Sequence, residues 1–130
     1  MRSSVPGAFL GIAAWMLMTA CGGTSARTRQ GFILTGGDAR RGPAAIFKYG
    51  CGSCHTIQGI SNAHGLVGPP LTGIGDRLYI GGVLRNTPGN MVRWIQDPKA
   101  VDDKTAMPRL GVTSPDATDI AAYLYSTKEE

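Results

Sequence analysis

Cysteine and histidine are scarce in this chain, which has three cysteines and two histidines among its 130 residues. Cys51, Cys54 and His55 lie together in one segment, Cys-Gly-Ser-Cys-His. A structural zinc site needs four ligands, and the remaining Cys and His side chains are Cys21 and His64. A thioredoxin-like redox pair belongs in a strand–helix context, and no β-rich run precedes Cys51. The sequence therefore disfavours both a structural zinc site and a thioredoxin-like redox pair.

The chain also lacks a large excess of charge of either sign. The formal net charge is +4, and from Asp38 onward 10 Lys and Arg residues are matched by 9 Asp and Glu residues. A nucleic-acid-binding domain concentrates basic residues on one face or helix, so this balance argues against nucleic acid as a partner. Strong electrostatic steering toward an acidic partner is not supported either.

No apolar run is long enough to span a bilayer as a helix, which takes about 20 residues. The run Ala8 to Met18 is shorter, follows a single early charge at Arg2, and precedes small residues. This order is typical of a secretory signal peptide. We therefore expect residues 1–20 to be an export signal and exclude them from the fold.

The segment Met18-Thr19-Ala20-Cys21 resembles a bacterial lipobox, in which the cysteine becomes the lipidated first residue of the mature protein. This resemblance implies a lipid on Cys21. Residues 21–37 are rich in Gly, Thr, Ser and Arg without periodicity, and we expect them to form a flexible, lipid-anchored linker. Ordinary cleavage near Ala20 and an uncleaved anchor are the alternatives.

Glycine and proline, by contrast, are abundant, with 19 and 8 residues. This composition favours short helices and loops over a large apolar core, and a small chain with a thin core usually needs a staple such as a cofactor. Thr87-Pro88 and Ser114-Pro115 have the pattern of an N-cap followed by a first-turn proline. The predicted fold is all-α, with three main helices and Gly/Pro-rich loops. The helices are expected from Asp38 to Gly50 (regular from near Gly42), from Thr87 to about Asp97 and from Ser114 to about Ser126, with loops over 56–89 and 99–113.

The segment Cys51-Gly52-Ser53-Cys54-His55 is the attachment motif of a c-type haem. The spacing lets one short turn present both thiols to one edge of the porphyrin, where they add across its vinyl groups. The adjacent histidine then lies beneath the iron and can bind it. One covalent haem c is the predicted cofactor, and it would supply the missing apolar volume.

A haem iron held by one histidine takes a sixth ligand or keeps an open site. The sequence favours Met107, in a loop stiffened by Pro108. Met91 lies on the apolar face of a predicted helix, where a core role is expected. His64 follows His55 so closely that the intervening loop would have to wrap around the ring edge. His64 and an open site remain the alternatives. Ligation by His and Met closes the iron to substrates and suits electron transfer.

Together these residues resemble the class I c-type cytochromes, over about Asp38 to Ser126. The resemblance implies that Cys51 and Cys54 hold the haem through thioethers and that His55 is the proximal ligand. It also explains the export signal, because cytochromes of this type are assembled outside the cytoplasmic membrane.

Gly68-Pro69-Pro70-Leu71 is similar to the family's Gly-Pro-x-Leu segment. This likeness implies that the Pro69 carbonyl accepts a hydrogen bond from the proximal imidazole and that Leu71 packs on the ring. Arg77 matches a family arginine near a haem propionate. Tyr79 is a further propionate candidate on spacing alone.

The run from Trp94 to Met107 keeps the family's spacing between a helix end and the distal methionine. It implies that Trp94 packs beside that ligand and that the Thr105 hydroxyl reaches a propionate. Phe47 and Tyr123 match aromatic contacts between the first and last helices. The family often has a glycine where these two helices cross, and here that place is Pro43, with Gly42 beside it.

We therefore expect a haem domain over 38–130 that carries single electrons and is tethered by lipid on the periplasmic side of the cell envelope. Its partners would be redox proteins such as a quinol–cytochrome c reductase or a terminal oxidase. The sequence has no candidate nucleophile–base pair, so an independent enzyme is not predicted. A fixed haem subunit of an oxidoreductase complex and a haem-based sensor of small ligands are the alternatives.

Overall fold

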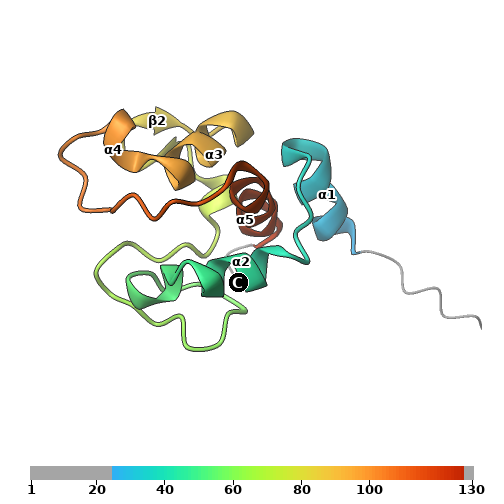
Figure 1. Cartoon of the computed structure of the whole chain (residues 1–130). Coiled ribbons are helices and arrows are strands. Elements are labelled where there is room, and N and C mark those ends of the chain that lie inside the picture. The colour runs from blue at the N-terminus through green and yellow to red at the C-terminus, as the bar shows by residue number, and fades with distance from the viewer. Residues whose placement is uncertain (1–24, 128–130) are drawn as a thin grey trace, which may run out of the picture.

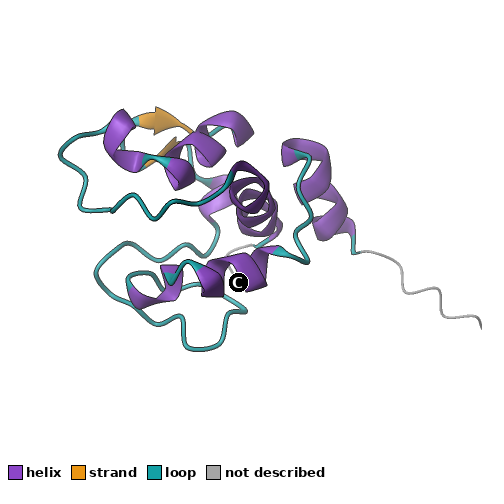
Figure 2. Ribbon diagram, in the orientation of Figure 1, coloured by secondary structure: helices purple, strands orange, loops and turns teal. Residues whose placement is uncertain are grey.

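The computed structural model describes residues 25–127. This part is mostly helical, which confirms the predicted all-α class. Figures 1 and 2 show the helices gathered around the last one, with long loops on one side. The elements in chain order are α1 (Ala26–Thr35), α2 (Gly42–Lys48), the 3-10 turns η1 (Cys51–Ser53) and η2 (Ile74–Asp76), the strands β1 (Tyr79–Ile80) and β2 (Leu84–Arg85), α3 (Pro88–Gln96), α4 (Pro98–Val101) and α5 (Ser114–Ser126).

Helix α5 is the centre of the fold, because α1, α2, α3 and η2 all pack against it. Successive positions along α5 serve different neighbours. Thr118 and Ala122 face α1 and its connection, whereas Asp119 and Tyr123 face the start of α2. Ile120 and Leu124 belong to the buried apolar core. The spacing of four within each pair follows from the helical period.

The predicted helix starts are nearly right. The Thr87 side chain accepts a hydrogen bond from the Asn90 amide at 3.3 Å, and α3 begins at Pro88 as predicted. For α5 the predicted cap was wrong by one residue, since Thr113 accepts from the Asp116 amide and Ser114 already lies inside the helix. A proline fits either of the first two helical positions, so its place does not fix the cap.

The prediction of a flexible linker over 21–37 is wrong for residues 26–35, which form α1. Ser25 caps this helix, and Gly31 lies directly against the backbone of Ala122 in α5. A Cβ at Gly31 would collide with the Ala122 carbonyl, so the contact depends on a missing side chain rather than on an apolar stripe. Periodicity therefore gave no sign of it. The predicted signal peptide and Cys21 lie outside the described residues.

The aromatic contact predicted for Phe47 is also wrong, since this side chain is 76% exposed. Tyr49 takes that place, and its hydroxyl donates to Asp116 Oδ2 of α5 at 2.7 Å. The close crossing of α2 and α5 is made by Gly42, where a Cβ would meet the Cβ of Tyr123. The helices therefore cross at a glycine despite Pro43 standing at the expected place.

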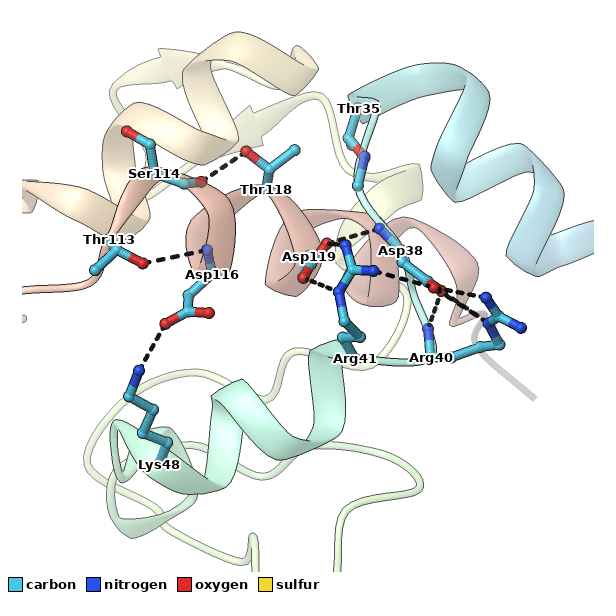
Figure 3. Close-up of polar contacts among 11 residues, drawn as sticks. Thr35, Asp38, Arg40, Arg41, Lys48, Thr113, Ser114, Asp116, Thr118 and Asp119 are labelled. Atoms are coloured by element: carbon cyan, nitrogen blue, oxygen red, sulfur yellow. Dashed lines mark hydrogen bonds and ion pairs between the residues drawn. The ribbon is translucent and has the colours of Figure 1, made fainter.

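The segment that joins α1 to α2 is fixed to α5 by one buried carboxylate (Figure 3). Asp119 is 5% exposed and accepts from the Asp38 amide at 2.7 Å. Its carboxylate also accepts from Arg41 Nε at 2.7 Å and from Arg41 Nη2 at 2.9 Å. Burying a carboxylate is costly unless its charge is paired and its oxygens are hydrogen-bonded, and both conditions are met here. α1 is thus held to the domain at both its glycine contact and its C-terminal connection.

Candidate haem-binding site

A cavity of about 570 Å³ lies beside α5. Its walls come from α2, the Cys-x-x-Cys-His segment, the two long loops, α3 and the face of α5 that carries Ile120 and Leu124. Most of the lining surface is apolar. Every cofactor-binding residue predicted from the sequence is part of this lining: Cys51, Cys54, His55, Pro69, Leu71, Arg77, Tyr79, Trp94, Thr105 and Met107.

The Cys51–His55 segment turns tightly at the end of α2. Gly50 has a φ of 68°, a left-handed conformation that favours glycine. The amides of Cys54 and His55 both donate to the Cys51 carbonyl, at 3.2 and 3.0 Å. Both thiols are half-buried and unpaired. Burial raises the pKa of the Cys51 thiol, which keeps it protonated near neutral pH.

The following loop folds back under this turn. The Gly65 amide donates to the Gly52 carbonyl at 3.1 Å, and the Gly68 amide donates to the Cys54 carbonyl at 2.8 Å. A Cβ at Gly52 would lie 2.8 Å from the Cα of Ala63, and one at Gly65 would meet the backbone of Ser53 and Cys54. The turn that carries the thiols is thus held by two backbone hydrogen bonds and by close packing of the following loop.

The ring of His55 has a fixed orientation. Its Nδ1 lies 2.8 Å from the Pro69 carbonyl oxygen, which has only acceptor capacity, so Nδ1 carries the proton and donates. The Nε2 lone pair is then free to bind a metal. Gly68 packs flat on the same ring, and a Cβ there would lie 2.6 Å from Nδ1. The sequence placed Gly68 in the motif without a role, and the structure supplies one.

Met107 and Thr105 line the cavity from the loop between α4 and α5. The Met107 amide donates to Thr105 Oγ1 at 3.3 Å, and the Thr105 amide donates to the Asp102 carbonyl at 3.2 Å. Met107 is partly buried and packs on the core. Trp94 is 9% exposed, and a Cβ at Gly81 would touch its indole ring at 2.5 Å.

The other two candidates for a sixth ligand lie differently. His64 is exposed, pairs with Thr56 in an isolated β-bridge and does not line the cavity. Met91 does line it, but it is 2% exposed within α3 and belongs to the core cluster. Of the candidates, Met107 alone combines a loop position with a place on the cavity wall.

Arg77 and Tyr79 lie on the cavity wall, Arg77 just before β1 and Tyr79 at the start of this strand. Arg77 Nη2 donates to the carbonyl oxygens of Pro70 at 2.8 Å and Thr72 at 3.1 Å. These bonds hold the arginine to the loop that contains Leu71. Tyr79 is 53% exposed at the same edge.

Sequence reasoning missed a part-buried polar contact that holds this loop. Asn86 Nδ2 donates to the carbonyls of Ile74 at 2.7 Å and Arg77 at 2.8 Å. Its Oδ1 accepts from the Tyr125 hydroxyl of α5 at 2.6 Å. Both amide hydrogens and the amide oxygen are therefore used. A single asparagine before Thr87-Pro88 carries no local signal for contacts so distant in the chain.

The family model for cytochrome c matches residues 39–128, the part of the chain that surrounds this cavity. The chain belongs to the cytochrome c family. Membership implies one covalently bound haem c and a role in electron transfer. The cavity fits this group, because two free thiols and an imidazole with a free Nε2 line an otherwise largely apolar space.

Two curated relatives are both named cytochrome c oxidase subunit 2. The protein of Alkalihalophilus pseudofirmus (strain OF4) is 32% identical over 91 residues, which cover 69% of this chain and 26% of the relative. The protein of Bacillus sp. strain PS3 is 30% identical over 102 residues, covering 75% of this chain and 28% of the relative. This chain thus spans about a quarter of the relatives' length. No solved structure matches it significantly.

Proposed function

We propose that this cytochrome is a membrane-tethered, single-haem electron carrier with His55 and Met107 as axial ligands. The haem iron would supply the one-electron change between its ferric and ferrous states. Cys51 and Cys54 would hold the group through thioethers. The observation that carries the proposal is the His55–Pro69 hydrogen bond of 2.8 Å, which frees Nε2 on the wall of a cavity that Met107 also lines.

The protein's own residues would set the properties of the bound group. Pro69 keeps the imidazole oriented and raises its basicity as a ligand. Thr105 fixes the backbone of Met107, and Trp94 and Leu71 exclude water from the cavity. Arg77 would turn from the Pro70 and Thr72 carbonyls to compensate propionate charge.

Absorption spectra of the full haem-loaded chain test the ligands. We expect a far-red sulfur-to-iron band in the ferric state and a ferrous spectrum that carbon monoxide leaves unchanged. Met107→Ala should abolish the band and admit carbon monoxide, and the reduction potential should fall because a thioether ligand raises it.

His64→Ala is the matched control, because His64 is exposed and off the cavity wall. Its spectra should equal those of the parent. Carbon monoxide binding by the parent chain would contradict Met107 ligation and favour the sensor. Loss of the far-red band in His64→Ala rather than in Met107→Ala would overturn the ligand assignment.

A second role, as a fixed haem subunit of an oxidase complex, is favoured by the relatives, both named as subunits of cytochrome c oxidase. Redox partners of either form would be a terminal oxidase or a quinol–cytochrome c reductase. Purification from native membranes separates the two roles. A carrier would leave the complex at moderate salt, whereas a subunit would keep a fixed ratio to its partners.

The tether itself is proposed as a lipid on Cys21, which places the domain on the periplasmic side. No helix within residues 25–127 is both long and apolar enough to cross a bilayer. Mass spectrometry of the mature N-terminus should find a diacylated cysteine, and Cys21→Ser should release the domain from membranes. An unmodified N-terminus near Ala20 would contradict the lipid.

A further inference from the structure

Helix α1 has an exposed apolar surface that the core does not use. Phe32 is 59% exposed, Ile33 is 72% exposed and Leu34 is 43% exposed. Consecutive helical residues are about 100° apart, and Gly31 faces α5. Residues 32–34 therefore cover the whole outward arc of this turn. We call these three residues the α1 apolar patch.

The charged residues of α1 have one sign. Arg27 and Arg29 are exposed on the same helix, which has no acidic residue. Neither arginine takes part in the ion pairs found within residues 25–127. Exposed large apolar side chains and unneutralised arginines on one short helix are features that interfacial segments of anionic bilayers share.

The chain outside the described part indicates which surface is near. Cys21 stands five residues before Ala26, and a stretch of that length reaches at most about 18 Å when extended. A lipid at Cys21 would therefore keep α1 within reach of the bilayer at all times.

We propose that α1 is a membrane-contact helix, whose apolar patch inserts into the interface of an anionic bilayer with Arg27 and Arg29 at the headgroups. This inference rests on the proposed membrane tether. It replaces a freely swinging domain by one with a preferred orientation. Because Gly31 and Asp119 lock α1 to α5, the orientation of the helix is that of the domain.

The orientation has a functional consequence. No residue of α1 lines the cavity. Figure 1 shows α1 on one side of α5, and the loops that carry His55 and Met107 on the other. With α1 on the bilayer, these loops point away from the lipid and toward redox partners.

Hydroxyl-radical footprinting of the full, haem-loaded chain tests the proposal. Vesicles of phosphatidylcholine, with and without phosphatidylglycerol, are compared with detergent-free buffer. On the anionic vesicles, we expect oxidation of Phe32 and Leu34 to fall roughly fivefold or more as the side chains leave water. Phe47 is similarly exposed but lies on α2, and its oxidation should not change.

Charge variants supply the second arm. Arg27→Gln/Arg29→Gln should lower the protection on phosphatidylglycerol vesicles to the level seen on phosphatidylcholine alone. Arg85→Gln/Lys104→Gln removes the same charge from exposed sites away from α1 and should leave the protection intact. Salt should weaken the protection of the parent chain, because it screens exposed charges.

The outcomes separate this inference from the tether. A chain that floats with vesicles while Phe32 and Leu34 stay reactive keeps its tether but overturns the contact helix. A chain that does not float overturns both. Protection that appears without vesicles and grows with protein concentration would assign the patch to a second copy and overturn the proposal.

Discussion

The two sides of α5 are built on opposite plans. Toward α1, Gly31 and Gly37 bring backbone directly onto Ala122 and Thr118, with no side chain between the segments. Toward the cavity, Ile120 and Leu124 are large aliphatic residues, yet they border an open space of about 570 Å³. On the side toward α1, which we call the glycine-packed side, polypeptide atoms alone fill the space between the segments. The cavity side is complete only with a cofactor, so the chain's stability is divided between its own atoms and those of the haem.

The largest effect should follow from leaving the cavity side empty. Without the haem, the apolar walls of a space of about 570 Å³ stay in contact with water and lose a burial worth about 25 cal/mol per Å² of apolar surface. The whole stability of a domain is typically about 5–15 kcal/mol. A chain made without the haem-attachment machinery should therefore lose cooperative unfolding in urea and its near-ultraviolet circular dichroism.

Hydrogen exchange in the haem-free chain sharpens this comparison. Amides of α1 and α5 should lose most of their protection along with the cavity loops, because α5 is shared by both sides. A urea midpoint equal to that of the haem-loaded chain would contradict the prediction and show that the glycine-packed side folds alone.

A smaller loss should follow from disturbing a third glycine contact of α5, at its crossing with α2. A Cβ at Gly42 would lie 2.9 Å from the Asp119 carbonyl oxygen and would also meet the Cβ of Tyr123. Gly42→Ala should lower the free energy of unfolding of the haem-loaded chain by roughly 1–3 kcal/mol, measured in urea.

Gly89 is the matched control for that substitution, because a Cβ there has no atom within 4 Å. It lies in the first turn of α3, where replacing glycine by alanine should add stability, up to the roughly 0.5–1 kcal/mol found in helix interiors. Opposite signs for Gly42→Ala and Gly89→Ala are expected. A stabilised Gly42→Ala would mean that the two helices do not cross as closely as their backbones indicate.

These two sides also differ in how far the sequence could predict them. The Cys-x-x-Cys-His turn and the Gly-Pro-x-Leu segment are local, so their residue types and spacing announce their chemistry. The placement of Met107 on the same cavity wall followed from counting candidate ligands. The all-α class could also be predicted. The starts of α3 and α5 followed from Ser/Thr-Pro pairs to within one residue.

The glycine-packed side escaped prediction because its contacts are between distant segments and depend on absent side chains. Gly31 touches Ala122 across the length of the domain, and nothing near residue 31 announces that partner. The same holds for Asn86, whose partners are backbone carbonyls and Tyr125. The contact predicted for Phe47 was wrong for a different reason, since it was carried over from the family resemblance by position, whereas in this chain Tyr49 makes the contact with α5.

The hydrogen bond between Tyr125 and Asn86 should contribute less to the free energy of unfolding. The Tyr125 hydroxyl on α5 donates to Asn86, which in turn holds the loop of Arg77. Tyr125→Phe should cost about 1 kcal/mol of unfolding free energy. In a double-mutant cycle with Asn86→Ala, the coupling should be about 0.5 kcal/mol or more. Strictly additive losses would show that the two side chains act independently.

The smallest effect should come from two surface carboxylates, one on each side. The Lys48 ammonium, followed by the Tyr49 hydroxyl, lowers the pKa of Asp116 to about 2 by hydrogen bonding. Arg40 does the same for Asp38, whose pKa is also about 2. Asp116 thus braces Tyr49, which lines the cavity, and Asp38 lies in the connection from α1 to α2 (Figure 3).

Both carboxylates have a folded-state pKa below the usual 3.8, so each contributes stability that is present above that pH. The contribution is lost as the pH falls from about 4 toward 2. Because both pairs are exposed and screened, the loss should be small. The urea midpoint of Asp116→Asn should decline less steeply over this range than that of the parent, and Asp38→Asn should behave likewise.

The difference between parent and variant isolates these groups from the haem ligands, which also respond to acid. If the visible spectrum is followed along with unfolding, Asp116→Asn should shift the acid transition of the cavity side, because the hydrogen bond from the Tyr49 hydroxyl then has a neutral acceptor and is weaker. Asp38→Asn should leave that spectral transition in place. Equal spectral shifts in the two variants would mean that both sides of α5 unfold together in acid, as one cooperative unit.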